Sequence, residues 1–151
     1  ESSYEKRKAG DFPPTMAKPT DSLYSGIDWG LQKLNMRALE ESGFFTKGFL
    51  DNYQNIALHI DSALKTGKIK WHVGDMPEFG PSGGEANPWC NCQDHPDHYA
   101  KKVTISNLDF GKTDVSFNWT WGDNFLYKVK AKQVEGKWKV DYLEGFDSKA
   151  Y

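Results

Sequence analysis

The chain has 151 residues, a length that allows one domain with a core of its own and no need of cross-links. Charged residues make up 26% and hydrophobic residues 38%, a composition typical of globular proteins and not of disordered ones. The net charge is −2 and the basic residues are almost all lysine, with arginine only at Arg7 and Arg37, which argues against nucleic-acid binding.

Residues 1–20 are polar, contain prolines and show no apolar repeat, so they predict a flexible lead-in to a single domain over residues 21–151. Such a segment is typical of the stretch between a lipid anchor or a cleaved signal and the folded domain. We therefore expect an exported protein, in the periplasm or attached to the membrane. A remnant of an expression tag is the alternative for part of the segment. No stretch of the sequence has the length and apolar character of a transmembrane helix.

A first helix is predicted over residues 21–41. Thr20 and Asp21 are good N-cap types, and apolar side chains follow them at helical spacing. Gly43 marks the end, because glycine readily adopts the left-handed conformation that closes a helix. Glycines inside the segment disfavour an unbroken helix, so a break near Gly30 is the open alternative.

A second helix is predicted after Thr46, which is a good N-cap, and it ends at Lys65 before Gly67. Residues 68–73 alternate apolar and polar side chains, which predicts a short strand. The stretch 74–99 is then irregular and rich in proline and glycine. Loops of this length inside a compact domain are uncommon and are usually functional or mobile, so this one is a candidate site.

Residues 101–142 predict four consecutive antiparallel strands, because large apolar side chains occur at every second position. We expect the helices to cover the aromatic face of this sheet, which gives an α+β fold with N-terminal helices packed on a curved meander. The predicted aromatic face holds Phe117, Trp119, Trp121, Phe125, Tyr127, Trp138 and Tyr142. The opposite face holds Lys128, Lys130, Lys132 and Lys139, which would attract an acidic partner or simply keep the sheet solvated.

This order of elements resembles the cone-shaped α+β superfamily named for nuclear transport factor two, in which a curved sheet wraps around helices and often encloses a pocket. Two segments also resemble a family of bacterial exported domains of unknown function, many of them lipoproteins. Residues 44–49 (FFTKGF) match its helix start, and residues 87–94 (NPWCNCQD) match a second motif, with Asn87 and Trp89 in place of Asp and Phe. The resemblance covers residues 23–143.

The resemblance implies export and a cone that can hold a ligand. Some small exported proteins with such domains act as inhibitors or immunity proteins against cell-wall-degrading toxins. Dimerisation through the sheet face is common in the superfamily, so a homodimer is a further expectation. Because the superfamily includes enzymes, binding modules and structural adaptors, the resemblance leaves the activity open.

The densest chemical cluster of the sequence contains Cys90, Cys92, His95 and His98, whose side chains are all zinc ligands in other proteins. A single residue between the two cysteines is unusual for a zinc site, so this is a weak metal candidate. A strained disulfide between Cys90 and Cys92 is a second interpretation. We favour a third, in which Cys92 packs as a small apolar residue and Cys90 is partly exposed.

The neighbouring residues Gln93 and Asp94 suggest a structural role. Asp94 can close an Asx turn before His95, and Gln93 can bond an open strand edge. The alternative is a pocket enzyme, in which Asp94 acts as a general base beside a histidine. The sequence has no glycine-rich phosphate loop, no nucleophile elbow and no zinc-protease motif, and we expect no cofactor.

Large aromatic side chains in the irregular stretch indicate a contact surface. We expect Phe79 and Trp89 to bind a protein partner, with Gln93, Asp94 and His95 beside them. The sequence thus predicts an exported, non-enzymatic protein-binding domain, with an inhibitor or immunity protein as the most specific version. The alternative is a small-ligand-binding or enzymatic pocket protein of the same superfamily, with Asp94, His95 or His98 at the mouth of an aromatic cavity.

Overall fold

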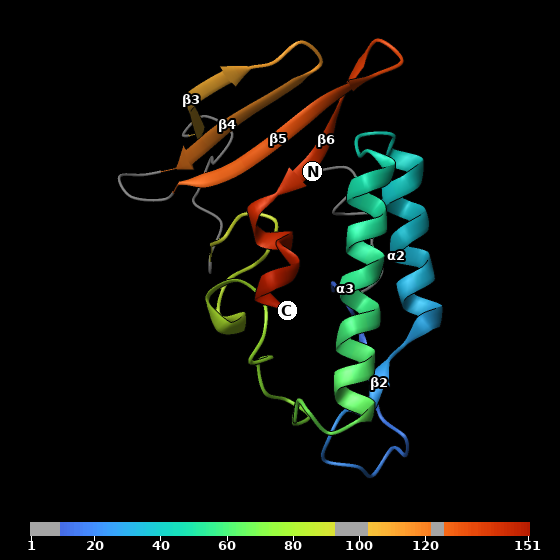
Figure 1. Ribbon diagram of the computed structural model, residues 1–151. Helices are drawn as coiled ribbons and strands as arrows, with labels where there is room; N and C mark the ends of the chain where they lie inside the picture. Colours follow the sequence, from blue (N-terminus) through green and yellow to red (C-terminus); the bar gives the residue numbers. More distant parts are fainter. Residues whose placement is uncertain (1–9, 93–102, 122–125) are drawn as a thin grey trace.

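The computed structural model describes residues 10–92, 103–121 and 126–151, without the side chain of Trp121. It shows two long helices, a four-stranded antiparallel sheet and a small two-stranded ribbon, which confirms the α+β class. In Figure 1 the two helices stand side by side, and the sheet lies across one end of them. Residues 66–92, which follow α3, run alongside α3, beneath the sheet. Of the helices that the structure describes, none has the length and apolar character to cross a membrane.

Helix α2 spans Trp29–Ser42 and begins later than predicted. Its N-cap is Asp28, whose carboxylate accepts the Leu31 N–H at 3.0 Å, and not Thr20 or Asp21. The residues before it form strand β2 (Gly26–Ile27), which pairs with β1 (Pro14–Thr15). The predicted start at residue 21 was therefore wrong, because residues 26–27 are extended and pair with β1 before the helix begins. The predicted end is confirmed, with Gly43 at a φ of 69°.

Helix α3 spans Lys47–Lys65, as the sequence predicted. Thr46 caps it by accepting the Phe49 N–H at 3.1 Å, and its hydroxyl also donates to Asp141 Oδ1 at 2.8 Å. The cap therefore ties the start of α3 to the last strand of the sheet. The apolar stripe of α3 forms the centre of the core, with Phe49, Tyr53, Ile56, Ala57, Ile60 and Leu64 all buried.

Residues 10–15, which belong to the predicted lead-in, pack into the domain. Phe12 and Pro13 are buried, and β1 follows them. We call residues 10–15 the strap. The folded part of the chain therefore begins before residue 21, and residues 1–9 lie outside the described ranges.

The sheet is built from β3 (Val103–Phe110), β4 (Asp114–Trp121), β5 (Tyr127–Val134) and β6 (Lys137–Leu143), each paired with the next. This confirms the predicted meander over the described residues. Residues 44–46 extend the β6 edge, because the Thr46 N–H donates to the Val140 carbonyl at 2.9 Å and the Val140 N–H donates to the Phe44 carbonyl at 2.8 Å. The helices thereby cover the β5–β6 end of the sheet.

The predicted alternation of the strands is confirmed at Tyr127 and Val129, which are both buried. It is wrong at Tyr142, because a bulge in β6 pairs Lys130 with Tyr142 and Ala131 with Val140. The extra residue turns Tyr142 to the lysine face, where the Lys130 ammonium lies 5.5 Å from its ring centroid.

The predicted strand over residues 68–73 is also wrong. The segment makes one isolated bridge, between Leu23 and His72, with hydrogen bonds from Tyr24 N–H to the Trp71 carbonyl and from Val73 N–H to the Ser22 carbonyl. The partner segment is irregular, so the pairing does not extend into a ladder.

Asp61 fixes the ribbon to α3. Its carboxylate accepts the Ile27 N–H at 2.9 Å and the Lys65 ammonium at 2.7 Å. A Cβ at Gly26 would lie 2.7 Å from the carboxylate, so only glycine allows this approach. Burial alone would raise the pKa of Asp61, but the hydrogen bonds from Lys65 and Ile27 outweigh it, and the pKa lies below the ordinary carboxyl value.

We expect Asp61→Asn to lower the free energy of unfolding at neutral pH by about 1–3 kcal/mol, because a buried charged hydrogen bond is lost. A group with a lowered folded-state pKa stabilises the fold above its ordinary pKa, and this contribution disappears as the pH falls through the folded-state pKa. The difference between wild type and variant should therefore shrink toward acid pH. Urea unfolding over a pH series measures it, and a difference that does not change with pH would contradict the assignment.

Candidate functional site

One carboxylate joins three distant parts of the chain. Asp11 of the strap accepts the Tyr53 hydroxyl of α3 at 2.7 Å through Oδ1. It accepts the Trp89 indole N–H at 2.7 Å through Oδ2. Charge-assisted hydrogen bonds of this kind are about twice as strong as neutral ones. The strap, α3 and the irregular segment are therefore held in one arrangement.

Phe12 follows Asp11 and fills an aromatic box. Its side chain is 3% exposed, and its ring centroid lies 4.8 Å from Tyr53, 5.4 Å from Tyr151 and 6.4 Å from Phe146. Its φ of 50° is left-handed, a conformation that bulky L-residues rarely adopt. Backbone strain of this kind costs about 1–3 kcal/mol and persists only where the surroundings impose it.

The two aromatic residues predicted to contact a partner pack mainly against the domain itself. The Trp89 ring lies 4.6 Å from Phe146, and it also contacts Phe45 and Phe49. Phe79 lies against Trp71 and Tyr151, at centroid distances of 5.3 and 6.3 Å. Both rings are half-buried. A role for Phe79 and Trp89 in binding stays a prediction, and alanine variants of either would also disturb the core.

The irregular segment is held to the sheet at Pro88. The buried Tyr127 hydroxyl donates to the Pro88 carbonyl at 2.6 Å and accepts the Gly145 N–H at 3.1 Å. A Cβ at Gly145 would lie 1.9 Å from the Pro88 oxygen, so this crossing needs glycine. Burial raises the pKa of Tyr127, which keeps its hydroxyl a neutral donor.

Cys90 and Cys92 form a disulfide, with their Cα atoms 5.2 Å apart, and both are buried. The favoured prediction of free thiols with Cys90 partly exposed was therefore wrong. Asn91 is left-handed, with a φ of 52°, and its N–H donates to the Asn87 carbonyl at 2.7 Å. The chain turns at this point and brings the two sulfurs together. The bonded sulfurs are not available as the thiolate ligands of the weak zinc candidate.

The other predicted site residues, Gln93, Asp94, His95 and His98, lie outside the described residues. The two remaining histidines, His59 and His72, are exposed. In the part of the chain that the structure describes, no group of three or more His, Cys, Asp or Glu residues is arranged to hold a metal ion.

An open cleft of about 370 Å³ lies between the strap and the irregular segment. Its walls are largely apolar, and its lining includes Phe12, Trp71, Met76, Phe79 and Tyr151. Asp11 and Glu85 supply carboxylates. Burial raises the pKa of Tyr151, whose hydroxyl donates to the Gly145 carbonyl at 2.8 Å. The cleft offers a ligand a mainly apolar surface with a few polar groups.

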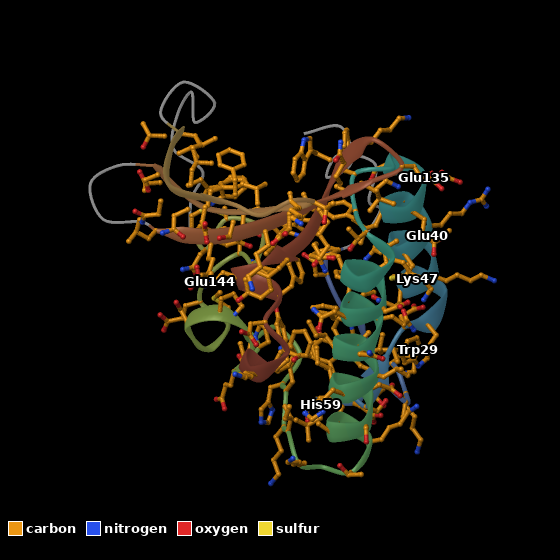
Figure 2. The ribbon with its side chains drawn as sticks, turned by 45° about the horizontal axis from the view of Figure 1, so that its top comes forward. Trp29, Glu40, Lys47, His59, Glu135 and Glu144 are labelled. Atoms are coloured by element: carbon orange, nitrogen blue, oxygen red, sulfur yellow. A yellow bond between two sulfur atoms is a disulfide. The ribbon has the colours of Figure 1, made fainter. Side chains whose placement is uncertain are left out.

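A second candidate site is apolar and exposed. Ile105, Phe110 and Trp138 are 58%, 69% and 51% exposed. Ile105 lies opposite Trp119, and Phe110 lies opposite Val115, so they share the face of the sheet that β5 turns toward the core. We call Ile105, Phe110 and Trp138 the arm surface. Figure 1 shows β3, which carries Ile105 and Phe110, extending with β4 away from the helices, and Figure 2 shows side chains on this end far from α3. Trp138 lies on β6, at the opposite edge of the sheet.

The arm surface was not predicted from the sequence, because the whole aromatic face was expected to lie beneath the helices. Trp138 lies on the predicted aromatic face but outside the part that the helices cover. It follows the β5–β6 turn, which holds Glu135 (Figure 2). The sequence of α2 did indicate that this helix does not cover the aromatic face, because its buried positions include the polar residues Gln32 and Asn35. The Asn35 amide donates to the Gly10 carbonyl at 3.0 Å, so this side of α2 meets the strap and not the sheet.

The opposite face of the sheet is basic. Lys128, Lys130 and Lys132 alternate along β5 and are exposed, and Lys139 lies opposite Lys132. Lys132 pairs with Asp141 at 2.6 Å, which leaves an excess of positive charge on this face. Burial and the Asp147 carboxylate raise the pKa of Tyr142, beside Lys130, to about 12.

Comparison of the chain with family models, with curated proteins and with solved structures found no match. Its function is therefore inferred from the chemistry of the described residues.

Replacement of both cysteines by serine (Cys90→Ser and Cys92→Ser) tests the disulfide. Loss of a cross-link that closes so short a ring should lower the free energy of unfolding by about 2 kcal/mol. Urea unfolding with and without reductant measures the effect. Reductant should lower the free energy of unfolding of the wild type to that of the variant, and it should leave the value of the variant unchanged. If the free energy of unfolding of the wild type equals that of the variant and does not change with reductant, the assignment of the disulfide is contradicted.

Proposed function

We propose that this chain is an exported, non-enzymatic domain that binds another protein through the arm surface. The observation that carries the proposal is the exposure of Ile105, Phe110 and Trp138 together on one face. Large exposed apolar patches are uncommon on soluble monomers and mark interaction sites. The three side chains lie at the two edges of the sheet, and the half-buried Phe117 and Trp119 of β4 lie between them on the same face. Aromatic side chains such as Phe110 and Trp138 are also the residue types that contribute most to binding energy at interfaces.

The form of the arm surface supports a protein partner. It is an open sheet face, whereas sites for small molecules are concave and enclose most of the ligand.

The disulfide supports export, because disulfides form and persist in oxidising compartments such as the bacterial periplasm. The proposal includes a lipid anchor upstream of the folded domain. It also includes a cone like that of nuclear transport factor two, which is open at its β3–β4 end. In its most specific version the partner is a cell-wall-active toxin, and the domain is its inhibitor or immunity protein. The resemblance of residues 44–49 and 87–94 supports this version.

The open cleft favours a second candidate function, which is small-ligand binding. Its largely apolar walls suit a flat or apolar ligand with few polar contacts. A thermal-shift screen of small aromatic compounds separates the two functions, because a cleft ligand would stabilise wild type and an arm-surface variant equally.

The test of the main proposal is a variant with Phe110→Ser and Trp138→Ser. Each aromatic anchor is expected to contribute about 2 kcal/mol, so capture of the partner should fall at least about tenfold. Leu58→Ser is the matched control, because Leu58 is 50% exposed on α3, away from the sheet. Capture from the extracytoplasmic fraction is measured by quantitative mass spectrometry. Equal capture by the arm-surface variant and the control would contradict the proposal.

Sedimentation of the wild type alone distinguishes a second copy of the chain from another protein. If the wild type is a dimer that the arm-surface substitutions dissociate, and no other protein is captured, the arm surface is a homodimer interface. That result would overturn the proposal of a different protein partner.

A further inference from the structure

The strap occupies a site that has separate polar and apolar parts. In the polar part, the Tyr53 hydroxyl and the Trp89 indole N–H point at one carboxylate from two different elements. Both groups donate to Asp11 at 2.7 Å. Tyr53 is buried, and its position is set by α3 and not by the strap. The donors would therefore suit any carboxylate placed at the same point.

In the apolar part, rings from α3 and from the C-terminal end of the chain enclose Phe12. Tyr53, Phe146 and Tyr151 form this box, and Phe146 belongs to a short turn (Glu144–Phe146) that follows β6. The turn begins at Glu144, which is labelled in Figure 2. The three rings are held by the body of the domain. The box is therefore shaped for an aromatic side chain that directly follows an acidic residue.

The strap is strained, and its backbone makes a small set of hydrogen bonds with the other described residues. Phe12 is left-handed, and Gly10 before it is exposed. The main polar ties of the strap backbone are the Asn35 amide to the Gly10 carbonyl at 3.0 Å, the Asp28 N–H to the Pro13 carbonyl at 2.8 Å, and the two-residue ribbon. A segment with the same side chains and a relaxed backbone would avoid the cost of the Phe12 conformation.

The open cleft gives a second segment access to this site. Gly10, Asp11 and Phe12 form part of its wall, so the cleft and the strap site are continuous. The proline residues after Phe12 are also suited to recognition, because proline-rich segments are already extended when free and lose little conformational entropy on binding.

We propose that the strap site is a receptor for peptide segments of the type acidic–aromatic–proline, and that the strap is its built-in occupant. A segment of this type from another protein competes with the strap for Tyr53, Trp89 and the aromatic box. The apparent affinity for an outside segment is therefore its intrinsic affinity multiplied by the fraction of time for which the strap is open. The strap site is separate from the arm surface, which lies on the sheet.

The probe is a capped peptide with the sequence of residues 10–15, Gly-Asp-Phe-Pro-Pro-Thr. Its receptor is the full chain with Asp11→Asn and Phe12→Leu, which removes the charge and the ring of the strap but keeps the core filled. Calorimetry should show binding to this variant at least about tenfold tighter than to wild type, because the competing strap is weakened. Peptides with Asn in place of Asp, or Ala in place of Phe, are controls and should each lose about tenfold or more.

Near-ultraviolet circular dichroism first establishes that the variant is folded. A folded variant that does not bind the peptide would overturn the proposal. Equal binding to wild type and variant would also overturn it, because the peptide would then lie elsewhere.

Native-state hydrogen exchange of the wild type tests the proposal without any variant. The Asp28 N–H is bonded to the Pro13 carbonyl, and the Ser25 N–H is bonded to the Thr15 carbonyl, both at 2.8 Å. If the strap opens while the domain stays folded, these two amides exchange at least about tenfold faster than the central amides of α3. Exchange of all of them at one common rate, that of global unfolding, would show that the strap does not open and would contradict the proposal.

Discussion

The Asp11 carboxylate is the contact on which the arrangement of the domain depends. Its partners Tyr53 and Trp89 are 42 and 78 residues away in the sequence. Hydrogen bonds to a charged group contribute about 1.5–3 kcal/mol each, a large part of the 5–15 kcal/mol by which small domains are stable. With Asp11 in place, the strap closes over α3 and the Trp89 ring is held against Phe146. Residues 74–92 therefore have a fixed course, although the longest regular element among them is the short 3₁₀ helix Pro81–Gly84.

The cap of α3 sets the other half of the fold. Thr46 bonds both α3 and Asp141 of β6, and the backbone of residues 44–46 pairs with the β6 edge. The helices are thereby fixed at one end of the sheet. With no helix over the other end, Ile105 and Phe110 remain exposed on the side that elsewhere forms the core. The proposed binding surface is a consequence of where this junction lies.

The sequence was informative where local rules and burial agree. The ends of α3, the stop at Gly43 and the alternation in β5 follow from capping, left-handed glycine and the period of a strand. The strap could not be predicted, because a polar, proline-bearing segment shows no repeat even when a single residue, Phe12, enters the core. The position of Tyr142 depends on one extra residue in β6, and alternation alone does not reveal a bulge.

The candidate site was harder to predict for the same reason. The long segment was identified as important, but Phe79 and Trp89 proved to pack mainly against the domain itself. The distant carboxylate of Asp11 holds Trp89 in this position. The disulfide depends on a left-handed Asn91, and the sequence does not reveal that conformation. The arm surface depends on how much of the sheet the helices leave uncovered, which is a property of tertiary packing.

The most direct test of the role of Asp11 is a double-mutant cycle between Asp11→Ala and Trp89→Phe, which removes the indole N–H and keeps a ring in the core. Urea unfolding gives the free energies of the wild type, both single variants and the double variant. We expect a coupling energy of about 1–2 kcal/mol, because the residues share one charged hydrogen bond. Additive effects, within about 0.5 kcal/mol, would show that Asp11 does not hold the irregular segment and would contradict its central role.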